Sequence, residues 1–328
     1  MSRQHLSVKG KENVTSTTEN KTNNTKLDDG DGDYLNFRNP INFTVLYLLL
    51  AIFRLVNAFI VRTQFDPDEY WQTLEPAYCA VLSQSSEECA LTWEWTRYDE
   101  LNGIPSKFPI WNLLSMAMHG PIRSYVAVLP TIMLYKLLKI FHTSMNIISD
   151  ELMTYLVRKG PALLNAVLFA APTDLAVYSI AQQVFHNESM ARFALLASVT
   201  SWFNGYALIR TYANSIECAL CTISFSFLGT DLFDEPKNYM TPLSLFAMFL
   251  GGISVAIRFS AVAFWVPVGL VVCFRKSNSK IKQLLLCLIT ALFGIIFSCV
   301  IDNCIYPFEF KVIPFLGSFH FNVILGTF

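Results

Sequence analysis

The feature that most constrains the fold is a series of apolar segments long enough, or nearly long enough, to cross a lipid bilayer. A crossing helix needs about 20 mainly apolar residues. The candidate segments are 41–60, 125–141, 161–185, 191–209, 217–233, 241–257, 260–274 and 281–301. Strands of a membrane barrel would alternate polar and apolar residues, and these segments do not. We therefore predict an all-α polytopic membrane protein with a bundle of about seven to eight transmembrane helices.

Composition agrees with this class and sets the N-terminal part apart. The chain is 53% hydrophobic and only 15% charged, whereas soluble proteins carry about 25% charged residues. Its net charge of −1 gives no basic field for nucleic acid. Residues 1–40 are rich in Asn, Thr, Lys, Asp and Gly, so we expect a disordered tail there and a membrane domain over 41–328.

Basic residues predict the orientation of the chain. Lys and Arg accumulate on the cytosolic side of a membrane, and they precede the first span and occupy the turn at 275–282. We therefore expect a cytosolic tail and a luminal loop over 62–124. Counting every segment as a full crossing, however, places 210–217 in the cytosol and the basic turn in the lumen. One crossing fewer before Arg210, or one more, removes the conflict, so we expect an error of one span there.

Three carboxylates, Asp66, Asp68 and Glu69, stand just beyond the first apolar segment. Acidic residues at a membrane face are costly unless they have a partner or a function. On a helix, the neighbours Asp68 and Glu69 would point about 100° apart, which favours divided roles. One would accept a proton from a sugar hydroxyl, and the other would hold an arginine or a substrate hydroxyl. The alternative is a solvated loop start in which Asp66 caps a short helix.

Two further motifs lie in the same loop. Trp93 and Trp95 flank Glu94, which would give flat apolar faces for sugar rings beside a hydroxyl acceptor; an interfacial aromatic belt explains them equally well. Arg123, where the loop re-enters the membrane, could bind a phosphate through two parallel hydrogen bonds. The alternative for Arg123 is a side chain that extends to the interface, and we expect this of Arg54 near the end of the first span.

A polar break and one isolated cation interrupt the later spans. Residues 210–217 separate two apolar segments, and Arg258 has apolar residues on both sides. A cation inside the membrane predicts a function. We expect its partner to be Glu217, Asp302 or a lipid phosphate.

The cysteines give weaker signals. Cys79 and Cys89 would form a disulfide if the loop is in an oxidising lumen, and two free thiols are the equal alternative. Cys218 and Cys221 have metal-site spacing, but they stand in an apolar run without His or a second pair, so we interpret them as core thiols.

Four motifs in this order resemble a known family: Pro67-Asp68-Glu69-Tyr70-Trp71-Gln72, Thr92-Trp93-Glu94-Trp95, Ile122-Arg123-Ser124-Tyr125 and Arg210-Thr211…Asn214-Ser215…Glu217. The family is the dolichyl-phosphate-mannose-dependent mannosyltransferases of the endoplasmic reticulum, which have the GT-C fold. The resemblance covers roughly 41–325. Phe53-Arg54…Asn57, together with the tryptophan motif, is most similar to the branch that adds the third mannose of the glycosylphosphatidylinositol (GPI) anchor.

The resemblance implies an activity and a site. It implies transfer of mannose from dolichyl-phosphate-mannose to a GPI precursor, in α-1,2 linkage with inversion, by a multi-pass protein of the endoplasmic reticulum whose active site faces the lumen. Asp68 would be the catalytic base and Glu69 would position it. The remaining substrate-binding residues would be Tyr70, Trp71, Gln72, Trp93, Glu94, Trp95, Arg123, Ser124, Tyr125, Arg210, Asn214, Glu217 and Arg258. The partners would be a lipid-linked donor and a glycolipid acceptor, without a cofactor or metal ion.

Departures from the family pattern leave other functions open. Residues 96–121 form a long insertion, Phe259-Ser260 replaces a Pro-Thr pair, and the chain ends at Phe328 before the family's last helices. We therefore expect a chain that lacks the C-terminal part of the family. The alternatives are a mannosyltransferase that builds the N-glycan lipid precursor, an inactive shortened form that binds the lipid donor, and a transporter that uses Arg258.

Overall fold

The computed structural model describes residues 42–63, 67–83, 89–96, 117–233, 240–275, 280–306 and 312–324. Within these ranges every regular element is a helix, and none is a strand. The predicted all-α class is therefore confirmed. The predicted disordered tail over 1–40, the predicted cap Asp66 and most of the insertion at 96–121 lie outside the described residues.

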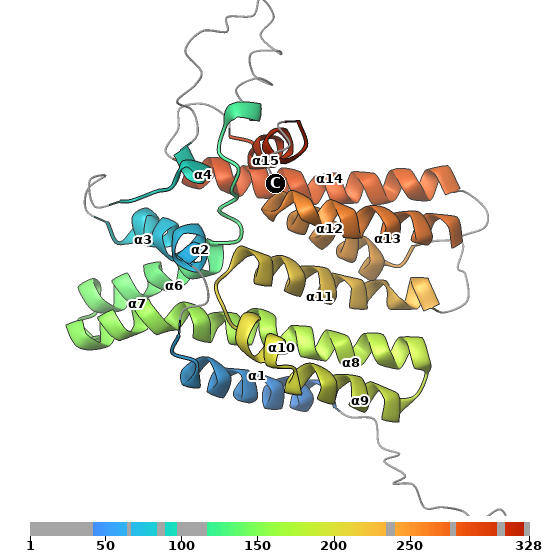
Figure 1. The fold of residues 1–328 in the computed structure, drawn as a ribbon, viewed down its shortest axis with the longest axis horizontal. Helices are drawn as coiled ribbons and strands as arrows, with labels where there is room; N and C mark the ends of the chain where they lie inside the picture. The colour runs from blue at the N-terminus through green and yellow to red at the C-terminus, as the bar shows by residue number, and fades with distance from the viewer. Residues whose placement is uncertain are drawn as a thin grey trace, which may run out of the picture. The chain divides into compact units, whose positions relative to one another are not determined.

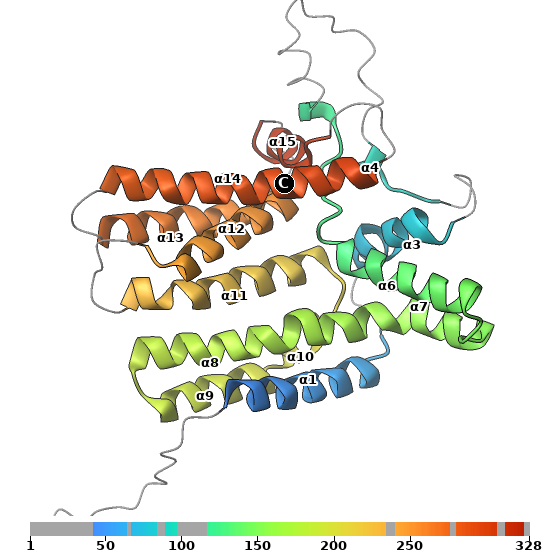
Figure 2. The ribbon, with the colours of Figure 1, turned by 180° about the vertical axis from the view of Figure 1, so that it is seen from behind.

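Long helices lie side by side and form the bundle (Figures 1 and 2). They are α1 (Phe43–Ile60), α8 (Ala171–Phe185), α9 (Glu188–Thr200), α11 (Ala213–Phe233), α12 (Pro242–Ile257), α13 (Val262–Arg275) and α14 (Lys280–Ile305). Shorter elements lie near the end of the bundle where α1 stops and α11 starts (Figure 1). These are α2 (Pro67–Glu69), α3 (Glu75–Val81), α4 (Trp93–Thr96) and α6 (Leu129–Lys139). The acidic segment and the tryptophan motif are thereby brought to one end of the bundle.

Several helices have the length and composition of membrane spans. Three are long and apolar enough to cross a bilayer, namely Phe43–Ile60, Asp150–Phe185 and Ile281–Ile305, and Pro242–Ile257 and Phe259–Val272 are shorter apolar helices. Large apolar side chains on α1 and α14, such as Leu49 and Phe293, are exposed, as expected where lipid replaces water. The chain is a multi-pass membrane protein.

The structure narrows the predicted number of membrane crossings before Arg210. Asp150–Phe185 is one continuous helical segment of 36 residues, about 54 Å long at 1.5 Å per residue. Its first half, α7 (Asp150–Asn165), packs on α6, and its second half, α8, lies in the bundle. With 11 residues, α6 is too short to cross a hydrocarbon layer of about 30 Å. The segments predicted at 125–141 and 161–185 therefore supply one candidate span, and Arg210 lies at the same end of the bundle as Glu69, with which it forms an ion pair.

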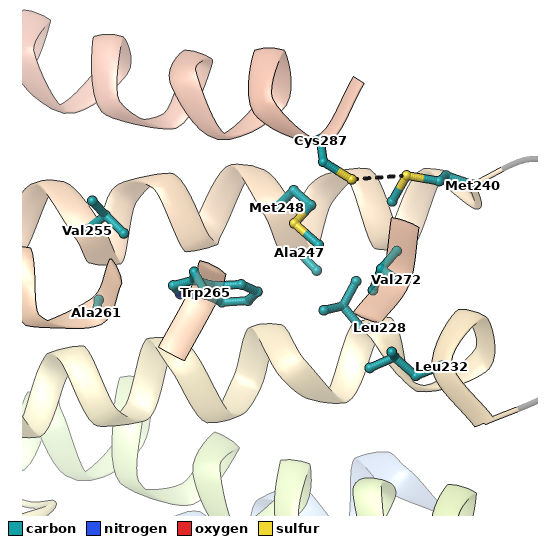
Figure 3. Packing of buried hydrophobic residues seen from close by; sticks show 10 residues of the cluster. All are labelled: Leu228, Leu232, Met240, Ala247, Met248, Val255, Ala261, Trp265, Val272 and Cys287. Carbon is teal, nitrogen blue, oxygen red and sulfur yellow. Dashed lines mark hydrogen bonds between the residues drawn. The ribbon is translucent and has the colours of Figure 1, made fainter. Parts of the chain in front are cut away.

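Helices α11 to α14 share one hydrophobic core. Figure 3 shows how side chains from these helices, among them Leu228, Met248 and Trp265, meet around α12. The closest approach is between α12 and α14: a Cβ atom added at Gly252 would collide with the carbonyl oxygen of Ala291. Glycine is required at this crossing because two helix backbones touch there.

Helices α1, α8 and α9 are joined differently, by a buried charged network. Arg54 donates from Nε to Asp174 Oδ2 at 2.6 Å and from Nη2 to Asp174 Oδ1 at 2.8 Å. Both side chains are completely buried, and Ser198 Oγ donates to Asp174 at 2.7 Å. The prediction that Arg54 extends to the interface is therefore wrong. A carboxylate on a neighbouring helix compensates its charge inside the protein.

Candidate active site

The helical turn α2 gives its two carboxylates different surroundings. Glu69 is buried, and its oxygens accept from Arg210 Nη1 and from Thr211 N and Oγ1, each at 3.3 Å. Asp68 is exposed and accepts a hydrogen bond from Gln72 Nε2 at 2.9 Å. Both oxygens of Glu69 are thus engaged in holding the segment at 210–211, whereas Asp68 faces outward from the same turn.

Arg210 is fixed on several sides at once. Besides Glu69, it donates to the carbonyl oxygen of Thr63, and its guanidinium lies 4.7 Å from the ring centroid of Tyr206. Asn165 on α7 donates to the Arg210 carbonyl at 2.6 Å. These contacts connect the start of the acidic loop with the polar break predicted at 210–217. Arg210 is therefore positioned to support α2.

Two arginine–carboxylate pairs stand near a cavity at this end of the bundle. Arg123 Nη2 lies 2.8 Å from Glu94 Oε1, and Arg258 Nε lies 3.6 Å from Glu217 Oε2. Ser260 also donates to Glu217, at 2.7 Å. Of the three partners predicted for Arg258, the structure provides Glu217.

The cavity itself is mainly apolar. Its volume is about 580 Å³, and Glu94, Arg123 and Arg258 are its charged lining residues. The apolar walls come from Ile122, Ile257, Phe259, Val262, Ala263, Phe321 and Val323. Each guanidinium group has a carboxylate partner, Glu94 for Arg123 and Glu217 for Arg258, and the Arg258 pair is the longer one at 3.6 Å. This combination suits a phosphodiester that carries an apolar chain.

The two tryptophans of the Thr92-Trp93-Glu94-Trp95 motif differ in exposure. Trp93 is exposed, and its ring centroid lies 5.0 Å from that of Phe321 at the cavity wall. Trp95 is only 1% exposed; its ring centroid lies 4.7 Å from that of Tyr125, with the ring planes tilted by 50°, and its indole N–H donates to the Trp71 carbonyl at 3.2 Å. The prediction of a sugar-binding face at Trp95 is therefore wrong, because its ring is in the core.

The residues of the motif at 123–125 also differ in their surroundings. Asp302, at the end of α14, accepts from Ser124 Oγ at 3.1 Å and from the Tyr125 backbone N–H at 2.6 Å. Ser124 and Tyr125 are buried. The predicted substrate contacts at these two residues are thus replaced by a structural role, in which they orient the cavity-lining Arg123.

Tyr70, Trp71 and Gln72 continue the turn after Glu69 as a π-helix (Tyr70–Leu74). Tyr70 is exposed and donates to Glu75 at 2.6 Å, and this hydrogen bond raises the pKa of Tyr70 to about 12. Trp71 is also exposed, whereas Gln72 is buried and contacts Asp68 through its amide. Tyr70 and Trp71 are therefore exposed, as Asp68 is.

The cysteines that the structure describes do not form a metal-binding group. Among the described residues, no group of three or more His, Cys, Asp or Glu side chains could hold a metal ion. Cys79 and Cys89 are free thiols in the structure. Burial raises the pKa of the Cys79 thiol.

Asn214 lies in a smaller adjoining cavity of about 300 Å³ together with Glu217 and Ser260. Its Oδ1 atom is buried without a hydrogen-bond partner. An unpaired buried amide oxygen is costly, so Asn214 is available to accept from a bound hydroxyl.

Sequence reasoning did not find Asp174, Glu75 or the role of Asp302. Each is a buried acid that holds an element of the site in place through contacts with distant residues. An acid in an apolar segment was the available signal for Asp174 and Asp302, because such a residue requires a partner.

Comparison with known proteins shows to which family the chain is similar. The Alg9-like mannosyltransferase family matches residues 45–327. GPI alpha-1,2-mannosyltransferase 3 of Mus musculus is 28% identical over 310 residues, which are 87% of this chain and 48% of the mouse protein. The human protein of the same name is 30% identical over 224 residues, 68% of this chain and 33% of its own length.

The same likeness extends to fungi. GPI mannosyltransferase 3 of Yarrowia lipolytica is 28% identical over 284 residues, 87% of this chain and 47% of the yeast protein. The chain thus spans about half the length, or less, of these curated relatives. No solved structure matches it. Because the family model covers nearly the whole membrane domain, the chain belongs to the Alg9-like mannosyltransferase family.

Proposed function

We propose that this protein transfers mannose from dolichyl-phosphate-mannose to a GPI-anchor precursor, adding the third mannose in α-1,2 linkage. The site would face the lumen of the endoplasmic reticulum. Membership of the family and the printed names of the relatives support the reaction class and the acceptor. The observation that carries the proposal is a largely apolar cavity of about 580 Å³ lined by Arg123 and Arg258, and Asp68, exposed on α2, is the candidate base.

The reaction needs one base and a leaving group that departs without an acid. The acceptor hydroxyl oxygen forms a bond to the anomeric carbon while the bond from that carbon to the phosphate oxygen breaks. The hydroxyl proton goes to Asp68, and dolichyl phosphate leaves with the bonding electrons. One displacement inverts the anomeric centre, which gives an α product from a β donor. Because phosphate is a good leaving group, a single essential carboxylate is sufficient.

Glu69 has a different role in this proposal. Its oxygens accept from Arg210 and Thr211, so it cannot readily accept a substrate proton at the same time. It instead holds α2 against the polar break and thereby fixes the direction of Asp68. Arg210 is committed to this support, which leaves Arg123 and Arg258 as the candidates for binding the donor phosphate.

The low dielectric of an apolar cavity makes the two arginines effective. A phosphate between Arg123 and Arg258 would gain charge as the bond to mannose breaks, and preorganised cations stabilise that charge. Arg123 is held by Glu94, and its Nε atom is buried without a partner. The apolar walls would contact the first isoprene units of the dolichyl chain.

A complementation experiment tests the acceptor class and the base together. The chain, and a version extended to the length of its relatives, would be expressed in cells deficient in the GPI third mannose and in cells deficient in N-glycan lipid-precursor mannosylation. We expect rescue of surface GPI proteins only. Asp68→Asn should abolish rescue, whereas Asp150→Asn, which changes an exposed carboxylate on α7, should not. Rescue of the N-glycan defect alone would contradict the proposed acceptor.

A further inference from the structure

A second cavity lies beside α2, on the side of Glu69. Its volume is about 600 Å³, and it is bounded by the end of α1, by α2, by α7 and by residues 209–211. Its charged lining residues are Arg62, Arg158, Lys159, Arg210, Glu69 and Glu151. Four cations and two carboxylates leave two positive charges. The cavity is therefore more strongly cationic than the one lined by Arg123 and Arg258.

Much of this positive charge is not compensated inside the protein. Arg210 and Glu69 form a pair with each other, and Lys159 donates to the carbonyl oxygen of Val61 at 2.9 Å. A lysine ammonium has three donors, so this backbone contact neither neutralises its charge nor uses all its hydrogen bonds. Arg62 and Arg158 are exposed at the cavity.

One buried atom points to a missing ligand. Arg210 is 7% exposed and lines the cavity. Its Nε–H is buried and has no hydrogen-bond partner, although Nη1 and Nη2 are both engaged. A buried donor of a charged group left unpaired is costly, and an anionic oxygen in the cavity would satisfy it.

We propose that this cavity binds the phosphate of the acceptor's headgroup, so that donor and acceptor phosphates occupy separate cavities, whose lining residues do not overlap. The inference rests on the proposed function, because it assigns an acceptor that carries a phosphorylated lipid headgroup. Arginine and lysine are the side chains best suited to phosphate oxygens. Glu69 lines the cavity, and Asp68 is the preceding residue of the same turn, so an acceptor anchored here would lie near the base.

The first test measures binding without turnover. Purified full-length chain in neutral-lipid nanodiscs would be titrated with short-chain phosphatidylinositol and, separately, with inorganic phosphate. We expect Arg158→Gln combined with Lys159→Gln to weaken phosphatidylinositol binding about tenfold or more, because two charged donors are lost. Arg192→Gln, which changes an arginine paired with Glu188 on α9, is the matched control. Arg62→Gln, at an exposed residue after α1, provides a second variant if the double variant does not fold.

The outcomes separate the possibilities. Unchanged phosphatidylinositol binding in the double variant and in Arg62→Gln would overturn the inference, and so would equal weakening by Arg192→Gln. Inorganic phosphate that binds as tightly as the lipid and displaces it would overturn the assignment to a lipid headgroup. Binding should also fall as salt is raised.

A transfer assay links the site to the reaction. In the double variant the acceptor KM should rise about tenfold while the donor KM stays the same, as expected when uniform binding is lost. If the wild-type chain shows no transfer, but the variants bind phosphatidylinositol more weakly than the wild type does, the proposed function is contradicted. The anion site would still be supported in that case.

Discussion

Two arginine–carboxylate pairs join helices of this bundle, and they differ in what surrounds them. Arg54 and Asp174 are completely buried, with side-chain exposures of 0% and 0% and a short contact of 2.6 Å. Arg258 and Glu217 are 29% and 15% exposed and 3.6 Å apart, and Arg258 lines a cavity. The first pair has no access to a ligand, whereas the second does.

The difference teaches how to interpret a charge within a membrane domain. A buried cation in an apolar helix indicates a specific role, but the role depends on whether its partner satisfies it. Arg54 makes a bidentate pair with Asp174, which also accepts from Ser198, so its role is to join α1 to α8, while its Nη1 atom is buried without a hydrogen-bond partner. Arg258 keeps a loose contact and faces a space, so it can exchange its partner for a substrate oxygen.

The largest expected effect is on the buried pair. Arg54→Met should lower the free energy of unfolding by about 3–5 kcal/mol, because Asp174 is left as an uncompensated buried charge. Thermal unfolding and yield in detergent would measure this change. The double variant Arg54→Met with Asp174→Leu should recover most of the loss, since both charges are gone. No recovery would mean that the pair does more than join helices.

At the partly exposed pair of Arg258 and Glu217, we expect a smaller effect on stability and a large effect on the rate of mannose transfer. Arg258→Gln should lower mannose transfer about 100- to 1000-fold, the usual loss when one charge-stabilising donor is removed. Protein abundance and the unfolding temperature should stay close to wild type. A variant that loses folded protein instead of activity would show that Arg258 resembles Arg54.

The next prediction separates Trp93 from Trp95. Trp95→Ala should cost about 3–5 kcal/mol of unfolding free energy, because it leaves a large cavity among Tyr125 and Tyr306. Trp93→Ala should change stability by less than about 0.5 kcal/mol, as for an exposed residue, and should raise a substrate KM. Equal destabilisation by the two substitutions, measured by thermal unfolding, would contradict the exposure difference.

A small effect on stability is also expected at Glu217. Glu217→Gln should destabilise the protein by less than about 1 kcal/mol, because the pair with Arg258 is long and partly open. Asp174→Asn, which alters the buried pair, should cost several times more. A comparison of the two unfolding temperatures measures the contrast directly, and similar losses would remove the distinction between the pairs.

Much of the fold could be predicted from the sequence, because apolar length alone identifies helices in a membrane. Each predicted span overlaps a helix, and the error of one crossing came from α6, whose apolar residues serve packing over too short a length. The predicted conflict at 210–217 was itself informative. Its resolution is the contact between Glu69 and Arg210, which are 141 residues apart, and no local pattern predicts such a pairing.

Within the site, the sequence predicted residue types better than roles. Trp93 and Trp95 read alike, and only packing against Tyr125 and Tyr306 assigns Trp95 to the core. Arg54 was predicted to extend to the interface and Arg258 to lie inside the membrane, whereas Arg54 is completely buried and Arg258 lines a cavity. Side chains two residues apart face different surroundings once a chain folds, so burial decides what a motif residue does.

The division of roles between Asp68 and Glu69 is the central claim, and paired measurements on one preparation test it most directly. Initial rates of mannose transfer per folded molecule and unfolding temperatures would be compared for wild type, Asp68→Asn and Glu69→Gln in a chain extended to the relatives' length. We expect Asp68→Asn to lose about 100- to 10,000-fold in rate, the contribution of a general base, with an unchanged unfolding temperature. Glu69→Gln should lower the unfolding temperature, because Arg210 loses its charged partner. Transfer by Asp68→Asn at a near wild-type rate would contradict the account.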